Sequence, residues 1–324
     1  VVWFDSSSHN RLLLAISAFV SILLVSSPSL ITMAVLGPLD EGARQLRRSG
    51  VRFASDRSFE EIGNLRLLVL DAPGVVTTGT PKVTDYVLLD GIELRELLRT
   101  AGSAAAVSTS PIARALAARA SEAGEFSMAA HFREEPARGF ESEIDGRKVT
   151  IGSAAFLDSH GIDSERIQDE LNEFRTQGKT ALVFVVDGVT RGAIAFQEDV
   201  RPEVRTAVDA LKAMGIVVRM ITADERQTAE SIAGRAGIDE AVSYLTPAEK
   251  RRAITQSRKD APMAVVAAGG SATDLLACAE MGISLDTSAG NQYGTVGVGG
   301  TLSDLAHAIE QSRAAAGRAR RNLK

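Results

Sequence analysis

Cysteine is almost absent from this chain. Cys278 is the only one among 324 residues. A single thiol excludes an internal disulfide and any metal cage built from several cysteines. The pattern fits a reducing compartment.

An excess of charge of either sign is also missing. The formal net charge is −5, and 24% charged with 45% hydrophobic residues is an ordinary balance for a folded protein. Because there is no basic excess, we expect no nucleic-acid partner. The length fits two or three domains.

Charge is missing altogether between Leu12 and Leu39, a segment that is mostly apolar. A run of that length can cross a bilayer as a helix. A signal peptide would be shorter and would follow a more basic start, whereas Arg11 is the only Lys or Arg before this run. A buried helix of a soluble domain is the other alternative. The sequence predicts one transmembrane helix over residues 12–39.

Arginines follow this segment closely, at Arg44, Arg47, Arg48, Arg52 and Arg57. Basic residues near a span tend to stay in the cytoplasm. We therefore expect a membrane location, a stalk or linker over 40–64, and a cytoplasmic chain after about residue 40. A second basic run, 313–324, is either another juxtamembrane segment or a solvated helix face. The expected partners are the membrane and other membrane helices or protein subunits.

Strands and helices alternate in the second half. The apolar segment 65–70 predicts a buried strand that ends at Asp71, and 217–222 and 263–269 predict two more. Helices are expected over 201–215, over about 225–236 and after 263–269, the last ending near Gly282, and Thr246 to Glu249 form a capping box. Such repeated units imply a parallel sheet covered on both faces.

The middle of the chain differs. Asp145-Gly146 and Asp187-Gly188 each lie between segments of alternating hydrophobicity, which predicts two tight hairpins. We expect an antiparallel domain over 90–190 inserted into the α/β domain, which would comprise 65–89 and 191–312. Such an insertion lies over the carboxyl ends of the strands, where open α/β folds bind ligands.

Several motifs in order resemble those of P-type ATPases, in the heavy-metal branch. LDAPGVVTTG (70–79) resembles the phosphorylation motif, ITAD (221–224) the Thr-Gly-Asp motif, and TPAEK (246–250) the Pro-x-x-Lys segment. AAGGSATDLLACAEMGI (267–283) resembles the hinge motif. STSPIARAL (108–116) and ARGFESEIDGRKVTIG (137–152) resemble the nucleotide-binding motifs of the heavy-metal branch.

The resemblance implies a fold and a site. The fold class is α/β: a Rossmann-like, haloacid-dehalogenase-type phosphorylation domain with an inserted α+β nucleotide-binding-type domain, plus one N-terminal transmembrane helix. It implies Asp71 as the nucleophile that receives the ATP γ-phosphate. Lys250 and Thr222 match groups that hold the phosphate, and Asp224 is kept from the same motif.

The residues around Asp71 depart from the family pattern. Ala72 stands where the family has lysine, and Pro73 and Val75 stand where it has threonines. Since phosphoryl transfer depends on positioning and on neutralising charge, these changes remove groups that the reaction uses.

The hinge motif lacks its carboxylates. Ala268 and Ala272 replace two aspartates, and Ser271 replaces an asparagine. The resemblance implies that the family aspartate at 268 is the second carboxylate for Mg²⁺, a hard ion that requires oxygen ligands. Removing one electrostatic interaction of this type costs on the order of 3 kcal/mol in the transition state.

The nucleotide-binding motifs are also altered. Ser110 replaces the family histidine while Pro111 remains, and Ala137 replaces the first loop glycine while Gly139 and Gly152 remain. The two glycines either approach a nucleotide or serve ordinary turns. We expect weak ATP binding or none.

The predicted span carries Ser27-Pro28-Ser29 where the heavy-metal branch has Cys-Pro-Cys. Hydroxyls are poor ligands for soft metals, so no metal site is expected there. An ordinary proline kink is the favoured interpretation.

The leading hypothesis is a degenerate P-type ATPase that acts as a membrane-associated binding, regulatory or assembly protein. The alternative is an active cation or heavy-metal transporter phosphorylated on Asp71, and only that alternative requires ATP and Mg²⁺. A haloacid-dehalogenase-type phosphatase is a third hypothesis, opposed by Pro73, which stands where the general acid would be.

Overall fold

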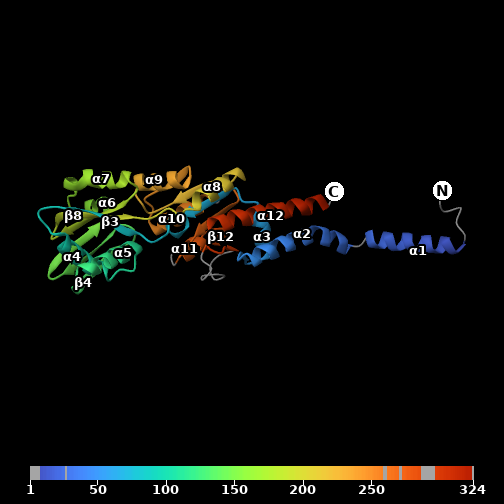
Figure 1. Cartoon of the computed structure of the whole chain (residues 1–324), viewed down its shortest axis with the longest axis horizontal. Coiled ribbons are helices and arrows are strands. Elements are labelled where there is room, and N and C mark those ends of the chain that lie inside the picture. The colour runs from blue at the N-terminus through green and yellow to red at the C-terminus, as the bar shows by residue number, and fades with distance from the viewer. Residues whose placement is uncertain (1–7, 26–27, 258–260, 270–271, 286–295, 323–324) are drawn as a thin grey trace.

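The computed structural model describes residues 8–25, 28–257, 261–269, 272–285 and 296–322 of the chain (Figure 1). The molecule is elongated. An N-terminal helix lies at one end, a first sheet with its helices lies in the middle, and a second sheet lies at the other end.

The first sheet has seven strands in the order β1-β13-β12-β11-β2-β9-β10. All neighbours are parallel except β1 and β13. Its strands are β1 Arg52–Phe53, β2 Leu67–Asp71, β9 Val217–Ile221, β10 Glu240–Val242, β11 Met263–Ala267, β12 Met281–Ser284 and β13 Val296–Gly297.

Helices cover both faces of this sheet, as the run of apolar residues predicts. They are α3 Asp56–Gly63, α8 Val204–Ala213, α9 Arg226–Ala236, α10 Pro247–Ser257, α11 Ala272–Ala277 and α12 Leu302–Asn322. Leu68 and Leu70 pack in the core with α3, α8, α9 and α12. Leu67 and Val69 pack on the opposite face with Ile254 of α10 and Leu275 of α11. Every residue of β2 is buried for that reason.

The second sheet has six antiparallel strands in the order β3-β8-β7-β6-β5-β4. They are β3 Lys82–Leu88, β4 Ala129–Glu135, β5 Gly139–Ile144, β6 Arg147–Gly152, β7 Thr180–Val186 and β8 Val189–Gln197. Helices α4 Leu94–Ala105 and α5 Pro111–Ala120 cover one face, and α6 Ala154–Ser159 and α7 Gln168–Thr176 cover the other.

Local sequence signals are confirmed in several places. Asp145, Gly146, Asp187 and Gly188 all have positive φ, from +51° to +77°, as two-residue hairpin turns require. The capping box is present: the Glu249 side chain accepts from the Thr246 N–H at 2.8 Å, and Thr246 Oγ1 accepts from the Glu249 N–H at 3.4 Å.

Two expectations on element limits are corrected. The sequence predicts that the inserted domain comprises 90–190. Its sheet also includes β3 (82–88) and β8 (189–197), which pair with each other, so the inserted domain extends beyond both expected limits. The helix expected to end near Gly282 ends at Ala277, because Met281–Ser284 pairs with β11 as strand β12.

The N-terminal region also differs from the single helix expected over 12–39. It consists of α1, Ser8–Val25, and α2, Pro28–Arg48, so residues 40–48 of the expected stalk continue α2. Helix α2 begins at Pro28, a position where proline is well tolerated. Ser27 lies outside the described residues, and the side chains of Pro28 and Ser29 are likewise not described. Within the described parts of the chain, no helix combines the length and the apolar character that crossing a bilayer requires.

Candidate active site at the carboxyl edge of the parallel sheet

Asp71 is the last residue of β2, which lies between β11 and β9 in the parallel sheet. Its register partner is Ile221, the last residue of β9, so Thr222 follows at the same edge. Ala267 ends β11, which places Ala268 at that edge too. The carboxyl ends of the strands thus bring together three of the segments singled out in the sequence.

Lys250 reaches Asp71 from α10. Its Nζ donates to Asp71 Oδ1 at 2.6 Å, and the two residues are 8% and 2% exposed. Burial raises the pKa of Asp71 above its ordinary value, the charge and hydrogen bond of Lys250 oppose that rise, and the nearby Asp224 carboxylate adds to it. The expected nucleophile and the expected phosphate-binding lysine are therefore paired directly with each other.

Thr222 and Asp224 lie beside this pair. The Thr222 hydroxyl is buried and donates to Asp224 Oδ2 at 2.7 Å, while the Asp224 N–H donates back to it at 3.2 Å. The structure thus brings all four expected catalytic positions to one edge of the sheet.

Sequence reasoning missed one acid at this site, Glu198. It follows β8, where the chain returns from the inserted domain, and it accepts a hydrogen bond from the Thr77 hydroxyl. Burial raises the pKa of Glu198, hydrogen bonds from Thr77 and the Gly79 N–H lower it, and Asp224 and Asp71 raise it. The sequence signal that could have indicated Glu198 is its position directly after β8, where the chain returns to the α/β domain.

The loop after Asp71 is packed tightly. Ala72 and Val75 are 1% and 0% exposed and belong to the core of the parallel sheet. Ala72 and Val75, which replace polar residues of the family motif, therefore pack in the apolar core. Gly74 has φ +77°, and a Cβ built on it would lie 3.0 Å from the Cβ of Ala268. Ala268 is thus in direct reach of the loop that carries Pro73.

The position that the resemblance assigns to the second Mg²⁺ carboxylate carries no side-chain oxygen. Asp71 Oδ1 is taken by Lys250, and the side chain of Ala268 offers no oxygen. Across the described ranges, no group of three or more His, Cys, Asp or Glu is placed to hold a metal ion. Ala272 is buried against Ala267 and Leu276, and Ser271 lies outside the described residues.

The residues expected to bind nucleotide have structural roles in the inserted domain. Ser110 is the N-cap of α5, its side chain accepting from the Ala113 N–H, and Pro111 is the first helical residue. The Ser108 hydroxyl donates to Glu134 of β4 at 2.9 Å. The next residue, Glu135, pairs with Gly139, so these segments lie at one end of the sheet.

Gly139 and Gly152 are not turn residues. They face each other across β5 and β6, and a Cβ on either would lie under 3.0 Å from the ring of Phe156. Close packing therefore requires glycine at both positions. Ala137, by contrast, has φ +66°, a left-handed conformation that favours glycine.

Known proteins resemble this chain in sequence and in fold. The haloacid dehalogenase-like hydrolase family profile matches residues 65–282. The copper-exporting P-type ATPase of Bacillus subtilis strain 168 is 27% identical over 328 residues, covering 100% of this chain and 41% of that protein. Copper-transporting ATPase 2 of Rhizobium meliloti strain 1021 is 28% identical over 326 residues, covering 99% and 39%. The chain spans about two fifths of the length of these curated relatives.

Solved structures agree. A zinc-transporting PIB-type ATPase in the E2.Pi state has a TM-score of 0.65 at 26% identity, covering 91% of this chain and 49% of that chain. The catalytic domain of the CPx-ATPase CopB-B has a TM-score of 0.63 at 18% identity, covering 84% and 98%. The second likeness shows a shared fold alone.

Proposed function

The chain belongs to the haloacid dehalogenase-like hydrolase family and, within it, to the heavy-metal branch of the P-type ATPases, and from that premise we propose that it is a pseudo-ATPase core. In this proposal the chain does not form an Mg²⁺-dependent aspartyl-phosphate. It serves instead as a membrane-associated binding, regulatory or assembly protein.

One observation carries the proposal. Lys250 Nζ lies 2.6 Å from Asp71 Oδ1 and compensates the charge of this buried carboxylate. Ala268, beside the loop that follows Asp71, offers no side-chain oxygen to a metal ion. The Asp224 carboxylate raises the pKa of Asp71, and Asp224 and Asp71 both raise the pKa of Glu198, so negative charge is concentrated at this edge of the sheet. An incoming phosphoryl group adds more negative charge, and Lys250 is already engaged. Each missing electrostatic interaction costs on the order of 3 kcal/mol in the transition state. These costs need not add, but together they oppose turnover.

Labelling with γ-labelled ATP and Mg²⁺ tests the proposal. We expect no acid-stable label on the wild-type chain. Ala268→Asp combined with Pro73→Thr restores two oxygen-bearing side chains at partly exposed positions, so the fold should accept them. Ala72→Lys is left out of this variant because Ala72 is buried in the core. We expect label only in the restored variant, and its loss when Asp71→Asn is added. Label on the wild-type chain that Asp71→Asn abolishes would overturn the proposal.

We also propose that ATP and Mg²⁺ are not held tightly. Ser110 is used as a helix cap, and Ala137 adds a methyl where the related motif has glycine. Calorimetric titration with ATP, with and without Mg²⁺, measures this directly. Saturable heat that depends on Mg²⁺ would contradict it.

An active transporter is the second candidate, because Asp71, Thr222, Asp224 and Lys250 are gathered at one edge of the sheet. An active transporter should hydrolyse ATP faster when the metal ion that it transports is added. Hydrolysis by the membrane-bound protein that copper or zinc ions stimulate would favour it. If neither copper nor zinc ions stimulate ATP hydrolysis, this second candidate is contradicted.

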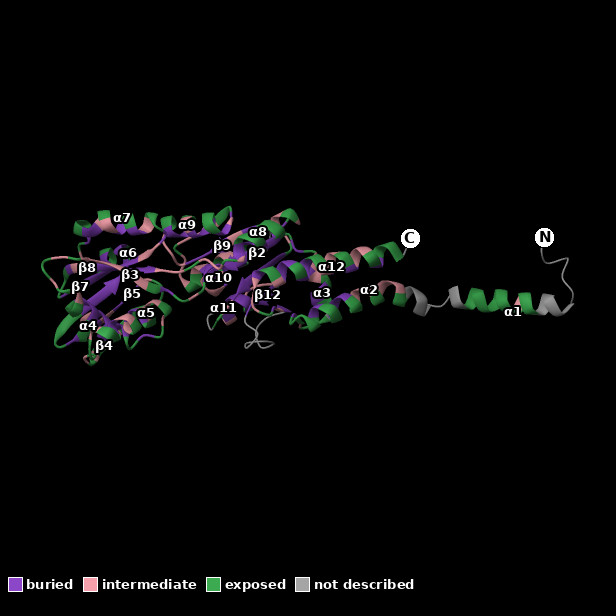
Figure 2. Cartoon of the chain, in the orientation of Figure 1, coloured by how far each residue is buried: buried purple, intermediate pink, exposed green. Residues whose placement is uncertain are grey.

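We propose a membrane location for the N-terminal helices, with the chain after about residue 40 on the cytoplasmic side. Leu13, Phe19 and Ile22 of α1 are 63%, 63% and 64% exposed, and Figure 2 shows that the described part of α1 lies away from the rest of the molecule. Large exposed apolar surface of this kind marks a membrane or protein contact. Carbonate extraction of membranes would test it, since a chain released with the peripheral proteins would contradict an integral location.

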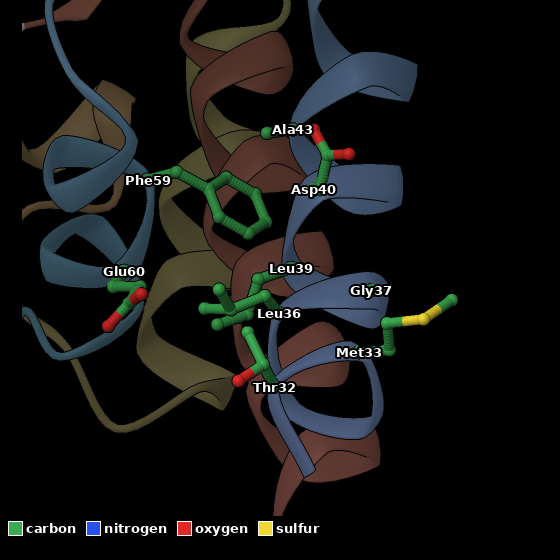
Figure 3. Close-up of a pocket in the computed structure, with 9 residues that line it drawn as sticks. All are labelled: Thr32, Met33, Leu36, Gly37, Leu39, Asp40, Ala43, Phe59 and Glu60. Carbon is green, nitrogen blue, oxygen red and sulfur yellow. The ribbon is translucent and has the colours of Figure 1, made fainter. Parts of the chain in front are cut away.

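A groove beside α2 supports a partner helix or subunit. It has a volume of about 450 Å³ and lies between α2 and α3. In Figure 3, Phe59 of α3 and Leu36 of α2 point toward each other, while Met33, which also lines the groove, points away from Phe59. Met33 and Leu36 are 70% and 51% exposed. Crosslinking from Met33→Cys in membranes, with Cys278→Ser as the background, would identify what contacts this surface.

A further inference from the structure

One short segment of the inserted domain contacts the parallel-sheet domain closely. Segment 175–180 comprises the end of α7, the connecting residues 177–179 and the start of β7, and it lies against α9. Figure 1 shows α7 and α9 end to end across the two domains. The segment is anchored in its own domain by Lys179, whose Nζ pairs with Asp85 of β3 at 2.6 Å.

The Thr180 hydroxyl crosses the boundary to Asp224. It donates to Asp224 Oδ1 at 2.9 Å, while Thr222 Oγ1 donates to Oδ2 at 2.7 Å. Both oxygens of this carboxylate are therefore bound by threonine hydroxyls, one from each domain. Neutral donors to a carboxylate give charge-assisted hydrogen bonds, which are stronger than neutral pairs.

Three further contacts surround this bridge. The Thr228 hydroxyl donates to the Lys179 carbonyl at 2.9 Å, and Arg175 pairs with Glu225. A Cβ on Gly178, which has φ +74°, would lie 2.5 Å from Ser231 Oγ. The two domains thus approach so closely here that only glycine fits.

The inserted domain also carries a charge that acts on α10. Hydrogen bonds from Thr246 lower the pKa of Glu249, and the Arg138 guanidinium of the inserted domain acts in the same direction. Arg138 follows β4, so it is remote in sequence from segment 175–180.

We propose that Thr222 and Asp224, together with Thr180, form an interdomain clasp that keeps the inserted domain docked on the parallel-sheet domain without nucleotide. The retained threonine and aspartate then have a structural use that does not require phosphate. The clasp stands whether or not Asp71 is phosphorylated, so it goes beyond the pseudo-ATPase proposal.

Single-molecule energy transfer on the full-length chain tests the clasp. The dyes are placed through Ser121→Cys in the inserted domain and Asp209→Cys in α8, both exposed, with Cys278→Ser removing the native thiol. Thr180→Val removes the bridging hydroxyl at nearly constant volume, and Thr180→Ser keeps it. Thr176→Val is the matched control, because Thr176 Oγ1 donates only within its own helix, to the Glu173 carbonyl.

We expect one high-transfer population for the wild type, Thr180→Ser and Thr176→Val, unchanged by 1 mM ATP. Thr180→Val and Asp224→Ala should enlarge a low-transfer population several-fold. A wild-type chain that is open until ATP is added, or a Thr180→Val chain that matches the wild type, would overturn the clasp. If Asp224→Ala fails to fold, Thr180→Val alone decides the result. Phosphorylation is measured separately, so failure of the pseudo-ATPase proposal is told apart from failure of the clasp.

Discussion

Lys250 Nζ and Asp71 Oδ1 lie 2.6 Å apart although 179 positions separate them in the sequence. Both side chains are buried at the carboxyl edge of the parallel sheet. Removing one partner of a buried ion pair strongly destabilises the fold, because the remaining charge stays buried without compensation. The pair that phosphate chemistry would use is thus also a structural element of this chain.

Lys250→Met should lower the free energy of unfolding by about 3 kcal/mol, since it leaves the Asp71 carboxylate buried and unpaired. The double variant Lys250→Met with Asp71→Asn should recover part of that stability, because the buried charge is then gone. Urea unfolding of the four species gives the coupling energy. Additive effects would show that the two side chains do not stabilise each other.

Glu198→Gln should raise stability at neutral pH. Burial, aided by Asp224 and Asp71, raises the pKa of Glu198 against the hydrogen bonds from Thr77 and Gly79. A carboxyl whose folded pKa is raised contributes stability at low pH, and that contribution is lost as pH rises through the folded pKa.

Glutamine keeps an acceptor for Thr77 and does not titrate. Its advantage over wild type should therefore be present at pH 7, shrink as pH falls through the raised pKa of Glu198, and be gone below about 4.3, the ordinary pKa of glutamate. Urea unfolding between pH 4 and pH 7 measures it. Asp209→Asn, an exposed carboxyl outside the site, is the control. An advantage that grows toward low pH would contradict the assignment.

Ala137→Gly should stabilise the inserted domain by up to about 1 kcal/mol, because the left-handed backbone conformation costs alanine roughly that much. The net effect is smaller than this cost, because glycine also increases the conformational entropy of the unfolded chain. Gly139→Ala should act in the opposite direction, since its Cβ would lie 2.6 Å from the Ile151 carbonyl oxygen. Thermal unfolding of both variants measures the pair. Equal effects of the same sign would exclude this explanation.

Ser110→Ala should cost about 1 kcal/mol, the usual effect when an N-cap side chain is removed. Ser110→Asn retains an oxygen acceptor for the Ala113 N–H and should cost much less. Urea unfolding separates the two. If the alanine variant is as stable as wild type, the serine is not acting as a cap.

Much of the architecture was predictable because its signals are local. The buried strand that ends at Asp71 is a continuous apolar run, and the two Asp-Gly hairpins and the Thr246 capping box depend on residues a few positions apart. The N-terminal run was less predictable. Its composition predicts one helix over 12–39, whereas the structure has α1 and α2.

The sequence alone indicated that Asp71 and Thr222 meet, because parallel strands bring their carboxyl ends to one edge of a sheet. Lys250 was assigned to the same site only through its resemblance to a family motif. Only the tertiary structure decided what surrounds them. Glu198 contacts Thr77 across 121 positions, and Thr180 contacts Asp224 across 44, from a different domain. Such contacts depend on how the inserted domain is oriented on the parallel sheet. No local periodicity or motif spacing encodes that orientation, since it is set by side-chain packing and charge pairing between surfaces that are remote in the chain.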